Sequence, residues 1–318
     1  MKFFSIALLI SVCRLITGDK EVTQQASIHL ADPTIFVDKG VYYLYGTVEQ
    51  NAGQGFQVYT SPDLKSWKLS DRNGGYALKK GDAFGSRGFG APQVFLYKAK
   101  YYMAYTANEN IAIAESDSPL GPFTQKDSVA LQAPVKQIDP FVYIDDDDKK
   151  YLYHVRLDSG NRIFVAEMED DFSAIKPSTL RECVNAKEPW ENTTGKWPVA
   201  EGPSIIKQNG VYYLFYSAND FRNPGYAVGY ATSNHPLGPW KKFAGNPILN
   251  KQLIGQNGTG HGDFFIVGKQ RYYVFHTHNS DAKTGPRKTA LVKVKFEKSK
   301  KSVGIWLMDK ESFIFLNK

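Results

Sequence analysis

Cysteine is scarce in this chain of 318 residues, so the sequence offers no framework of disulfide bonds. The two cysteines are Cys13 and Cys183. Cys13 lies in an apolar N-terminal segment, and removal of that segment would leave a mature chain without an intrachain disulfide. This suits a periplasmic or secreted protein whose core is large enough to be stable without cross-links.

Long apolar runs are also scarce, because only the N-terminus contains one. Lys2 is followed by FFSIALLISV and then by small and polar residues through Gly18. This pattern is typical of a secretory signal peptide over residues 1–18, and it predicts a periplasmic or secreted protein. Cys13 leaves a second interpretation, a lipoprotein acylated on that cysteine, although Val12 is bulky where a lipobox has a small residue. No later segment is apolar enough to cross a bilayer.

Patterns typical of nucleic-acid binding are missing as well. The net charge of +7 is spread along the chain, and the Lys-rich stretch from Lys293 to Lys301 is interpreted as a solvated face. The sequence contains no basic helix, zinc-ligand spacing or RNA-binding signature. We therefore expect no nucleic-acid partner.

Aromatic residues, in contrast, are abundant at 14 %, and they recur in a repeated motif. Each copy has an apolar run, a turn and a second run dense in Tyr and Phe. The five copies read DPTIFVDKGVYYLYGT, APQVFLYKAKYYMAYT, DPFVYIDDDDKKYLYHV, EGPSIIKQNGVYYLFYS and HGDFFIVGKQRYYVFHTH.

The copies lie roughly 50 to 60 residues apart, a period that indicates a repeat architecture. Helical signals are nearly absent, so each repeat is interpreted as a four-stranded antiparallel blade. The prediction is an all-β, five-bladed β-propeller in which residues 19–318 form one domain around a central axis. Trp67, Phe123 and Trp240 follow the blade turns and are expected to pack between blades, and the segments 81–90 and 183–200 are expected near the mouth of the central funnel.

Three copies begin with an acid: Asp32, Asp139 and Glu201. An isolated Asp-Pro often only starts a turn, but these acids occupy corresponding positions in copies one, three and four. In a propeller such positions converge on the axis, where three carboxyl groups repel one another and the pKa of at least one rises. A protonated acid beside an ionised one is the arrangement that glycoside hydrolysis needs.

The chain resembles glycoside hydrolase family 43 over about residues 28 to 300. The resemblance is carried by ADPTI at 31–35, VKQIDPFVY at 135–143 and AEGPSII at 200–206. It implies that Asp32 is the general base that activates water and that Glu201 is the general acid. Asp139 would tune the pKa of the acid and help to hold it. The family inverts the anomeric configuration in one displacement.

Two further residues acquire roles from the resemblance. His261 matches a family histidine that faces a calcium ion or a water cluster in the pore, and the alternative is a buried histidine bonded to the backbone. Arg287 matches an arginine that reaches a hydroxyl group of the bound sugar, and the alternative is a surface cation. No cofactor is expected for the chemistry, and a calcium ion would be structural.

The second copy departs from the family pattern. It reads Gly90-Ala91-Pro92-Gln93, where the family commonly has Trp-Ala-Pro-Glu. The missing Trp removes an expected wall of the sugar site, and Phe89 or Phe84 is expected to replace it as a stacking surface.

The predicted activity is exo-acting hydrolysis of α-L-arabinofuranosides in an oligo- or polysaccharide. β-Xylosidase activity is the close alternative, and another furanoside such as a galactofuranoside is a third. Two readings from other classes stay open, a non-catalytic carbohydrate-binding propeller and a scaffold for protein interactions.

Overall fold

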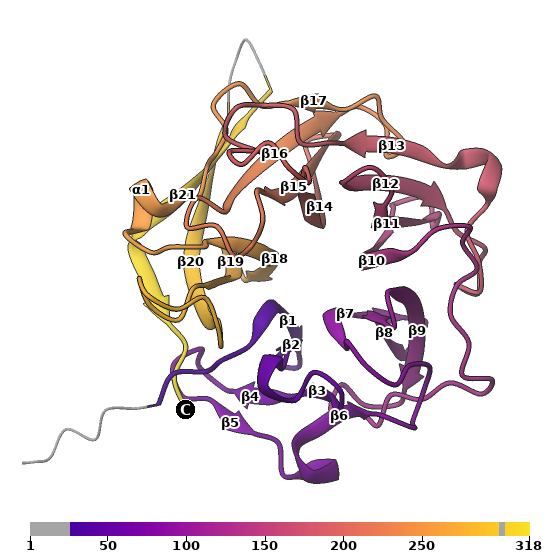
Figure 1. The fold of residues 1–318 in the computed structure, drawn as a ribbon. Coiled ribbons are helices and arrows are strands. Elements are labelled where there is room, and N and C mark those ends of the chain that lie inside the picture. The colour runs from indigo at the N-terminus through magenta and orange to yellow at the C-terminus, as the bar shows by residue number, and fades with distance from the viewer. Residues whose placement is uncertain (1–25, 299–302) are drawn as a thin grey trace, which may run out of the picture.

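The computed structural model describes residues 26–298 and 303–318. The predicted signal peptide and Cys13 lie outside these residues. Within them, successive antiparallel sheets are arranged in a ring, as the repeats predicted, and the fold is a five-bladed β-propeller (Figure 1). The same residues contain no helix that is long and apolar enough to cross a membrane.

Each blade begins at the axis and ends at the rim, in sequence order. Blade one consists of β1 (Ala31–Asp38), β2 (Val41–Thr47), β4 (Tyr59–Ser61) and β5 (Lys68–Leu69). Blade two consists of β7 (Gly90–Tyr97), β8 (Lys100–Ala107) and β9 (Asn110–Ser116). Its outer position is taken by a single bridge between Glu115 and Thr124, where we expected a fourth strand.

The other three blades have four strands each. Blade three consists of β10 (Gln137–Ile144), β11 (Lys150–Leu157), β12 (Asn161–Glu167) and β13 (Arg181–Val184). Blade four consists of β14 (Ala200–Gln208), β15 (Val211–Ala218), β16 (Ala227–Ser233) and β17 (Lys241–Lys242). Blade five consists of β18 (Gly260–Val267), β19 (Gln270–Thr277), β20 (Lys288–Glu297) and β21 (Ile305–Phe315).

Short elements fill the connections between the main strands. A small sheet pairs β3 (Gly55–Gln57) with β6 (Tyr76–Lys79). The helical turns are η1 (Glu49–Asn51), η2 (Arg72–Gly75), η3 (Pro177–Thr179) and α1 (Lys251–Ile254).

Apolar clusters lie between neighbouring blades and hold the ring together. Trp67 packs in a cluster with residues of blades one and five, and Phe123 packs in one with residues of blades one and two. Trp240 packs against the cluster of blades three and four. The predicted role of these three aromatic residues between blades is confirmed.

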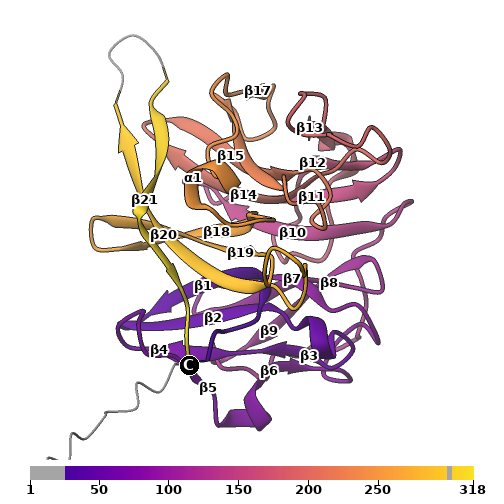
Figure 2. The same ribbon diagram turned by 60° about the vertical axis from the view of Figure 1, so that its left-hand side comes forward.

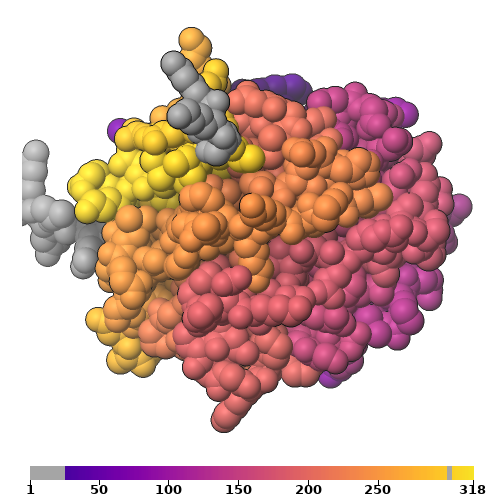
Figure 3. Space-filling view, turned by 90° about the horizontal axis from the view of Figure 1, so that it is seen from above, coloured from indigo at the N-terminus to yellow at the C-terminus, as the bar shows by residue number. Residues whose placement is uncertain are grey.

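The two ends of the described chain close the ring together. The backbone N–H of Ile28 donates to the carbonyl of Leu316 at 2.8 Å, and that of Lys318 donates to Ala26 at 2.8 Å. Figures 1 and 2 both place the C-terminus beside the first segment of blade one, and the long strand β21 forms the rim of blade five outside β20. The space-filling view shows blades four and five, in red to yellow, side by side on the surface (Figure 3).

Candidate active site

The innermost strand of every blade carries an irregularity at its start, and these irregularities build the site. The pairing of the first two strands shifts register there in each blade. Such bulges re-aim a side chain. The residue at the bulge has a positive φ in all five blades: Asp32, Ala91, Asp139, Gly202 and His261.

Asp32, Asp139 and His261 thus occupy equivalent positions and line one hollow on the axis. Glu201 does not share their position, because it lies one residue before the bulge, which is Gly202 in blade four. We expected the three acids to be equivalent, and this detail is corrected. A Cβ atom at Gly202 would lie 2.8 Å from the ring of His261, so the bulge of blade four has no room for a side chain.

At four of the five junctions a side chain at the end of a second strand accepts the backbone N–H at the bulge of the next blade. The hydroxyl of Thr47 accepts the N–H of Ala91 at 2.9 Å, and that of Ser217 accepts the N–H of His261 at 2.7 Å. The same contact joins Thr106 to Asp139 at 2.9 Å, and His276 Nδ1 to the N–H of Asp32 at 3.1 Å.

The junction of blades three and four departs from this pattern. Val155 holds the corresponding position, opposite Ile138, and its side chain has no acceptor. The N–H of Gly202 instead donates to Asp139 Oδ2 at 3.2 Å. Because a hydroxyl is missing here, the N–H of Gly202 is free to bond the carboxylate of Asp139, which links blade three to the backbone that follows Glu201.

Asp32 lies among cationic and donor groups. Its Oδ1 is 3.1 Å from the Arg287 guanidinium and 3.3 Å from Nδ1 of His261, and Thr47 donates to its Oδ2 at 2.7 Å. Burial alone would raise the pKa of Asp32, but the charges of Arg287 and His261 hold that pKa well below its ordinary value. The carboxyl group is thus kept ionised, as a base requires.

Glu201 lies in the opposite kind of environment. The side chain is 8 % exposed, and its oxygens accept hydrogen bonds from Tyr226 Oη and Asn161 Nδ2, both at 2.8 Å. Burial, and then the negative charge of Asp139, raise the pKa of Glu201 to about 7 against the two hydrogen bonds that lower it. The group can therefore hold a proton near neutral pH, as an acid requires.

Asp139 and His261 lie between these two carboxyl groups. Burial raises the pKa of Asp139, with the charge of His261 opposing the rise. Burial would lower the pKa of His261, but the three acids raise it above its ordinary value. The acids thus favour the protonated form of His261, whose Nδ1 lies 3.9 Å from Asp139 Oδ2.

Arg287, to which the resemblance gave a contact with a sugar hydroxyl, lies beside Asp32, and other residues fix its direction. Glu49 accepts from the backbone N–H of Arg287 at 2.6 Å and from its Nε at 2.9 Å. The guanidinium lies over the ring of Phe221 at 4.5 Å. Arg287 is therefore a buried partner of Asp32, and the alternative of a surface cation is wrong.

The calcium ion expected near His261 has no preformed ligand set. In the part of the chain that the structure describes, no group of three or more His, Cys, Asp or Glu side chains is arranged to hold a metal. Nδ1 of His261 instead faces Asp32 and Asp139. The side chains do not fit a directly bound metal, and no step below depends on one.

Phe89 does not have the predicted role as a stacking surface for sugar. Its side chain is 0 % exposed and packs against Tyr105 and Phe56 with ring centroids 6.1 and 5.8 Å away. The ring belongs to the core between blades one and two, so it is closed to a ligand. Phe84 is half-buried beside the same cluster.

Gln93, the other departure in blade two, has a structural contact. Its amide exchanges two hydrogen bonds with the backbone of Val142, at 2.7 and 3.0 Å. This contact joins the inner strands of blades two and three.

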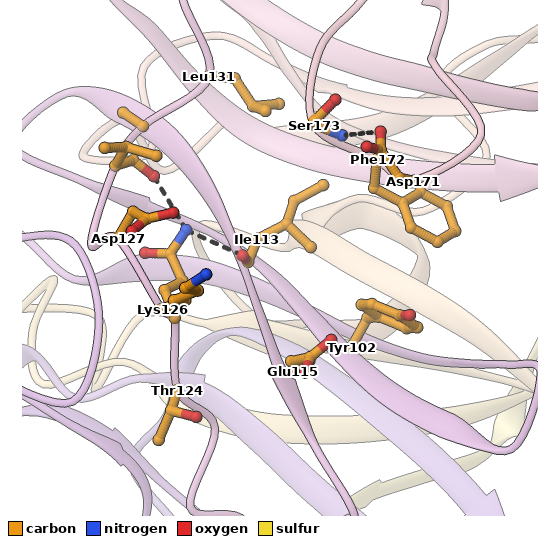
Figure 4. A pocket seen from close by; sticks show the side chains of 13 residues that line it. Tyr102, Ile113, Glu115, Thr124, Lys126, Asp127, Leu131, Asp171, Phe172 and Ser173 are labelled. Carbon is orange, nitrogen blue, oxygen red and sulfur yellow. Dashed lines mark hydrogen bonds between the residues drawn. The ribbon is translucent and has the colours of Figure 1, made fainter.

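A second hollow lies between blades two and three and contains none of the predicted site residues (Figure 4). Apolar side chains such as Tyr102, Ile113 and Phe172 line it together with Glu115 and Asp127. The three acids that line this hollow, Glu115, Asp127 and Asp171, are exposed, unlike the buried acids at the axis.

Comparison with known proteins agrees with this geometry. A family model described as glycosyl hydrolases family 43 matches residues 26–301. The chain belongs to glycosyl hydrolases family 43. It is therefore an inverting glycoside hydrolase.

Individual members of family 43 are similar to the chain over most of its length. The crystal structure of an endo-1,4-β-xylanase from Bacteroides thetaiotaomicron VPI-5482 is 41% identical, covers 92% of this chain and 98% of its own, and has a TM-score of 0.84. A xylosidase/arabinosidase from Bacteroides ovatus is 26% identical over 319 residues, covering 85% of this chain and 92% of its own length. A β-D-galactofuranosidase from Aspergillus niger is 23% identical over 268 residues, covering 77% and 73%.

Several residues of the site could not be predicted from a single sequence, because no repeated pattern marks them. Glu49, Asn161 and Tyr226 come from outer strands or connections, away from the repeated motif. His276 did have a signal, because it is a polar residue at the end of an aromatic strand and occupies the position of Thr47 in copy one.

Proposed function

We propose that this family 43 enzyme hydrolyses arabinose- or xylose-containing glycans and that terminal α-L-arabinofuranosyl groups are its first substrate. The observation that carries the proposal is the pairing of an ionised Asp32 with a proton-holding Glu201 at one end of the propeller axis. Both acids lie at the start of an inner strand, Asp32 at the bulge and Glu201 one residue before it, and their neighbours separate the two protonation states.

The roles follow from these protonation states. Asp32 takes a proton from a water molecule, whose oxygen attacks the anomeric carbon. The bond from that carbon to the leaving oxygen breaks, and Glu201 gives its proton to this oxygen. Asp139 keeps the pKa of Glu201 high by its negative charge and holds the Gly202 backbone. Because water attacks the face opposite the leaving group, the anomeric configuration is inverted.

The names of the relatives support the substrate class. They include a xylosidase/arabinosidase, and two arabinoxylan arabinofuranohydrolases from Paenibacillus polymyxa and Bacillus subtilis. β-Xylosidase activity is the second candidate, favoured by the first of these names and by the xylanase structure at 41% identity. The signal peptide predicted over residues 1–18 would bring the enzyme to polymeric substrates outside the cytoplasm.

The test is hydrolysis of aryl α-L-arabinofuranoside, β-D-xylopyranoside and β-D-galactofuranoside, together with arabinoxylan and xylan. We expect the arabinofuranoside to be turned over fastest and Asp32→Asn to abolish turnover while leaving substrate binding intact. Equal activity of Asp32→Asn and the native enzyme would place the base elsewhere. Binding of arabinoxylan without turnover of any substrate would contradict the proposal and favour a carbohydrate-binding propeller.

A further inference from the structure

Trp197 exposes a large aromatic surface close to the candidate acid. Its side chain belongs to the connection between β13 and β14, and the residue is 51% exposed, whereas Trp67 and Trp306 are 4% and 0% exposed. The connection is tied to blade three, because the N–H of Asn161 donates to the carbonyl of Pro198 at 2.8 Å. The indole ring is therefore held in place although it faces solvent.

A chain of two hydrogen bonds joins this ring to Glu201. The indole Nε1 of Trp197 donates to Asn161 Oδ1 at 2.8 Å, and Asn161 Nδ2 donates to Glu201 Oε2 at 2.8 Å. An indole N–H can only donate, so the Asn161 amide must turn its oxygen to the tryptophan and its NH2 group to the acid. Trp197 thus determines the orientation of the amide.

The two oxygens of Glu201 face different surroundings. Oε1 accepts from Tyr226, which is fully buried, so this oxygen faces the protein interior. Oε2 lies on the side of Asn161 and the exposed Trp197. One lone pair of Oε2 is used by Asn161, and the second can hold the proton that the leaving oxygen receives.

We propose that Trp197 is the platform for the sugar or chain that leaves, and that Asn161 is the positioning residue that aims Oε2 of Glu201 at the glycosidic oxygen. The aromatic face packs against the C–H face of the departing sugar, and the same ring holds the amide through its N–H. The inference rests on the proposed function, in which Glu201 is the general acid. It makes the connection 185–199 a determinant of leaving-group specificity.

Removal of the amide should also be visible in the dependence of rate on pH. Glu201 is faced by Asp139 of β10, by His261 of β18, and by Tyr226 and Arg222 of the connection that precedes β16. None of these groups changes when Asn161 is replaced. Asn161 stabilises the carboxylate form, so its loss should raise the pKa of Glu201.

The experiment compares Trp197→Phe, Trp197→Ala and Asn161→Ala with the native enzyme. The substrates are an arabinofuranosylated xylo-oligosaccharide and aryl α-L-arabinofuranosides with poor and activated leaving groups. Trp197→Phe keeps the ring and removes only the donor. The matched control is Trp240→Phe, a ring that packs against Tyr153 in the outer part of the propeller, and melting temperatures report whether each variant folds.

Asn161→Ala should lower kcat about tenfold on the poorer leaving groups, the loss expected for one hydrogen bond to a charged group, and move the basic limb of the profile to higher pH. Trp197→Phe should show a smaller change of the same kind with KM unchanged. Trp197→Ala should in addition raise KM for the oligosaccharide about tenfold, as loss of an aromatic contact predicts.

Two outcomes separate this inference from the proposed function. In the first outcome, Glu201→Gln and Asp32→Asn lose activity while folded Trp197 and Asn161 variants keep the native KM, kcat and pH profile. The roles proposed for Trp197 and Asn161 are then wrong, and the assignment of Glu201 as the acid stands. If Glu201→Gln retains full activity on poor leaving groups, the proposed function itself fails.

Discussion

The junction between blades five and one differs from the junction between blades three and four, although equivalent strands build both: the second strand of one blade and the first strand of the next. At the first junction His276 accepts the N–H of Asp32, and Arg287 faces the carboxylate. At the second, Val155 occupies the position that corresponds to His276, and Gly202 occupies that of Asp32. The bulge there carries no side chain, and the acid has moved one residue back along the strand.

This difference decides which acid is ionised. The first junction surrounds Asp32 with cations and holds its pKa low. The second leaves Glu201 buried beside the negative charge of Asp139, which raises its pKa to about 7. A repeated scaffold thus places the two carboxyl groups one residue apart on equivalent strands, and different residues at the two junctions give them opposite roles.

Removal of the acid should have the largest effect at the second junction. Glu201→Gln should lower kcat on substrates with poor leaving groups by about 10²- to 10⁴-fold, because proton donation is lost. Aryl glycosides with activated leaving groups need little protonation and should lose far less. Rates measured on both kinds of substrate test this, and equal losses on the two would count against Glu201 as the acid.

Removal of the cation at the first junction should have the next largest effect. Arg287→Met leaves Asp32 without its guanidinium partner, so kcat/KM should fall about 100-fold. The pKa of Asp32 should rise, so the acidic limb of the pH profile should move to higher pH. Arg271→Met is the control, because Arg271 lies over the ring of Trp306 away from the acids. An unchanged acidic limb in a folded variant would contradict the role of Arg287.

A side chain at Gly202, the bulge that has none, should make the two junctions more alike. It should also reduce stability and activity, because it disturbs the junction of blades three and four. Gly202→Ala puts a Cβ atom 2.8 Å from the ring of His261 at a φ of +58°, and such strain costs about 1–3 kcal/mol of unfolding free energy. We expect a lower melting temperature and about a tenfold loss of kcat. Gly210→Ala is the control, with a φ of +77° and nothing within 4 Å. Similar behaviour of the two variants would show that contact with His261 is unimportant.

The smallest change restores the hydroxyl that the second junction lacks. In Val155→Thr the new oxygen can accept the N–H of Gly202, and Asp139 then loses a donor that favours its charged form. With less charge on Asp139, the pKa of Glu201 should fall and the basic limb should move to lower pH, with about a threefold loss of kcat/KM. Val165→Thr, at another fully buried valine of blade three, is the control. A shift of the basic limb to higher pH would mean that the N–H of Gly202 still donates to Asp139 and not to the new hydroxyl.

The propeller and the acids could be predicted because they recur. Each blade needs the same apolar and aromatic pattern to pack against its neighbours, so the five copies are visible in one sequence. Asp32 and Asp139 stand out as acids at corresponding positions beside proline. Arg287 and His261 became candidates only through the resemblance to family 43.

The remaining details of the site depend on three-dimensional packing. Asn161 and Tyr226 reach Glu201 from an outer strand and a connection, whose sequences carry no repeated pattern. Phe89 was expected at the sugar site, but a sequence does not show which aromatic rings point into the core. The offset of Glu201 by one residue follows from the space that His261 occupies beside Gly202, a contact 59 residues apart along the chain.

The central claim is that Asp32 works ionised and Glu201 works protonated, and the pH dependence of kcat/KM tests it most directly. The profile should rise through the low pKa of Asp32, stay high in mildly acidic solution and fall with a basic limb near pH 7, as Glu201 loses its proton. In Glu201→Gln, measured on an activated aryl glycoside, the basic limb should disappear and the acidic limb should remain. A basic limb that persists unchanged in that variant would contradict the account, because the titrating acid would then be another group.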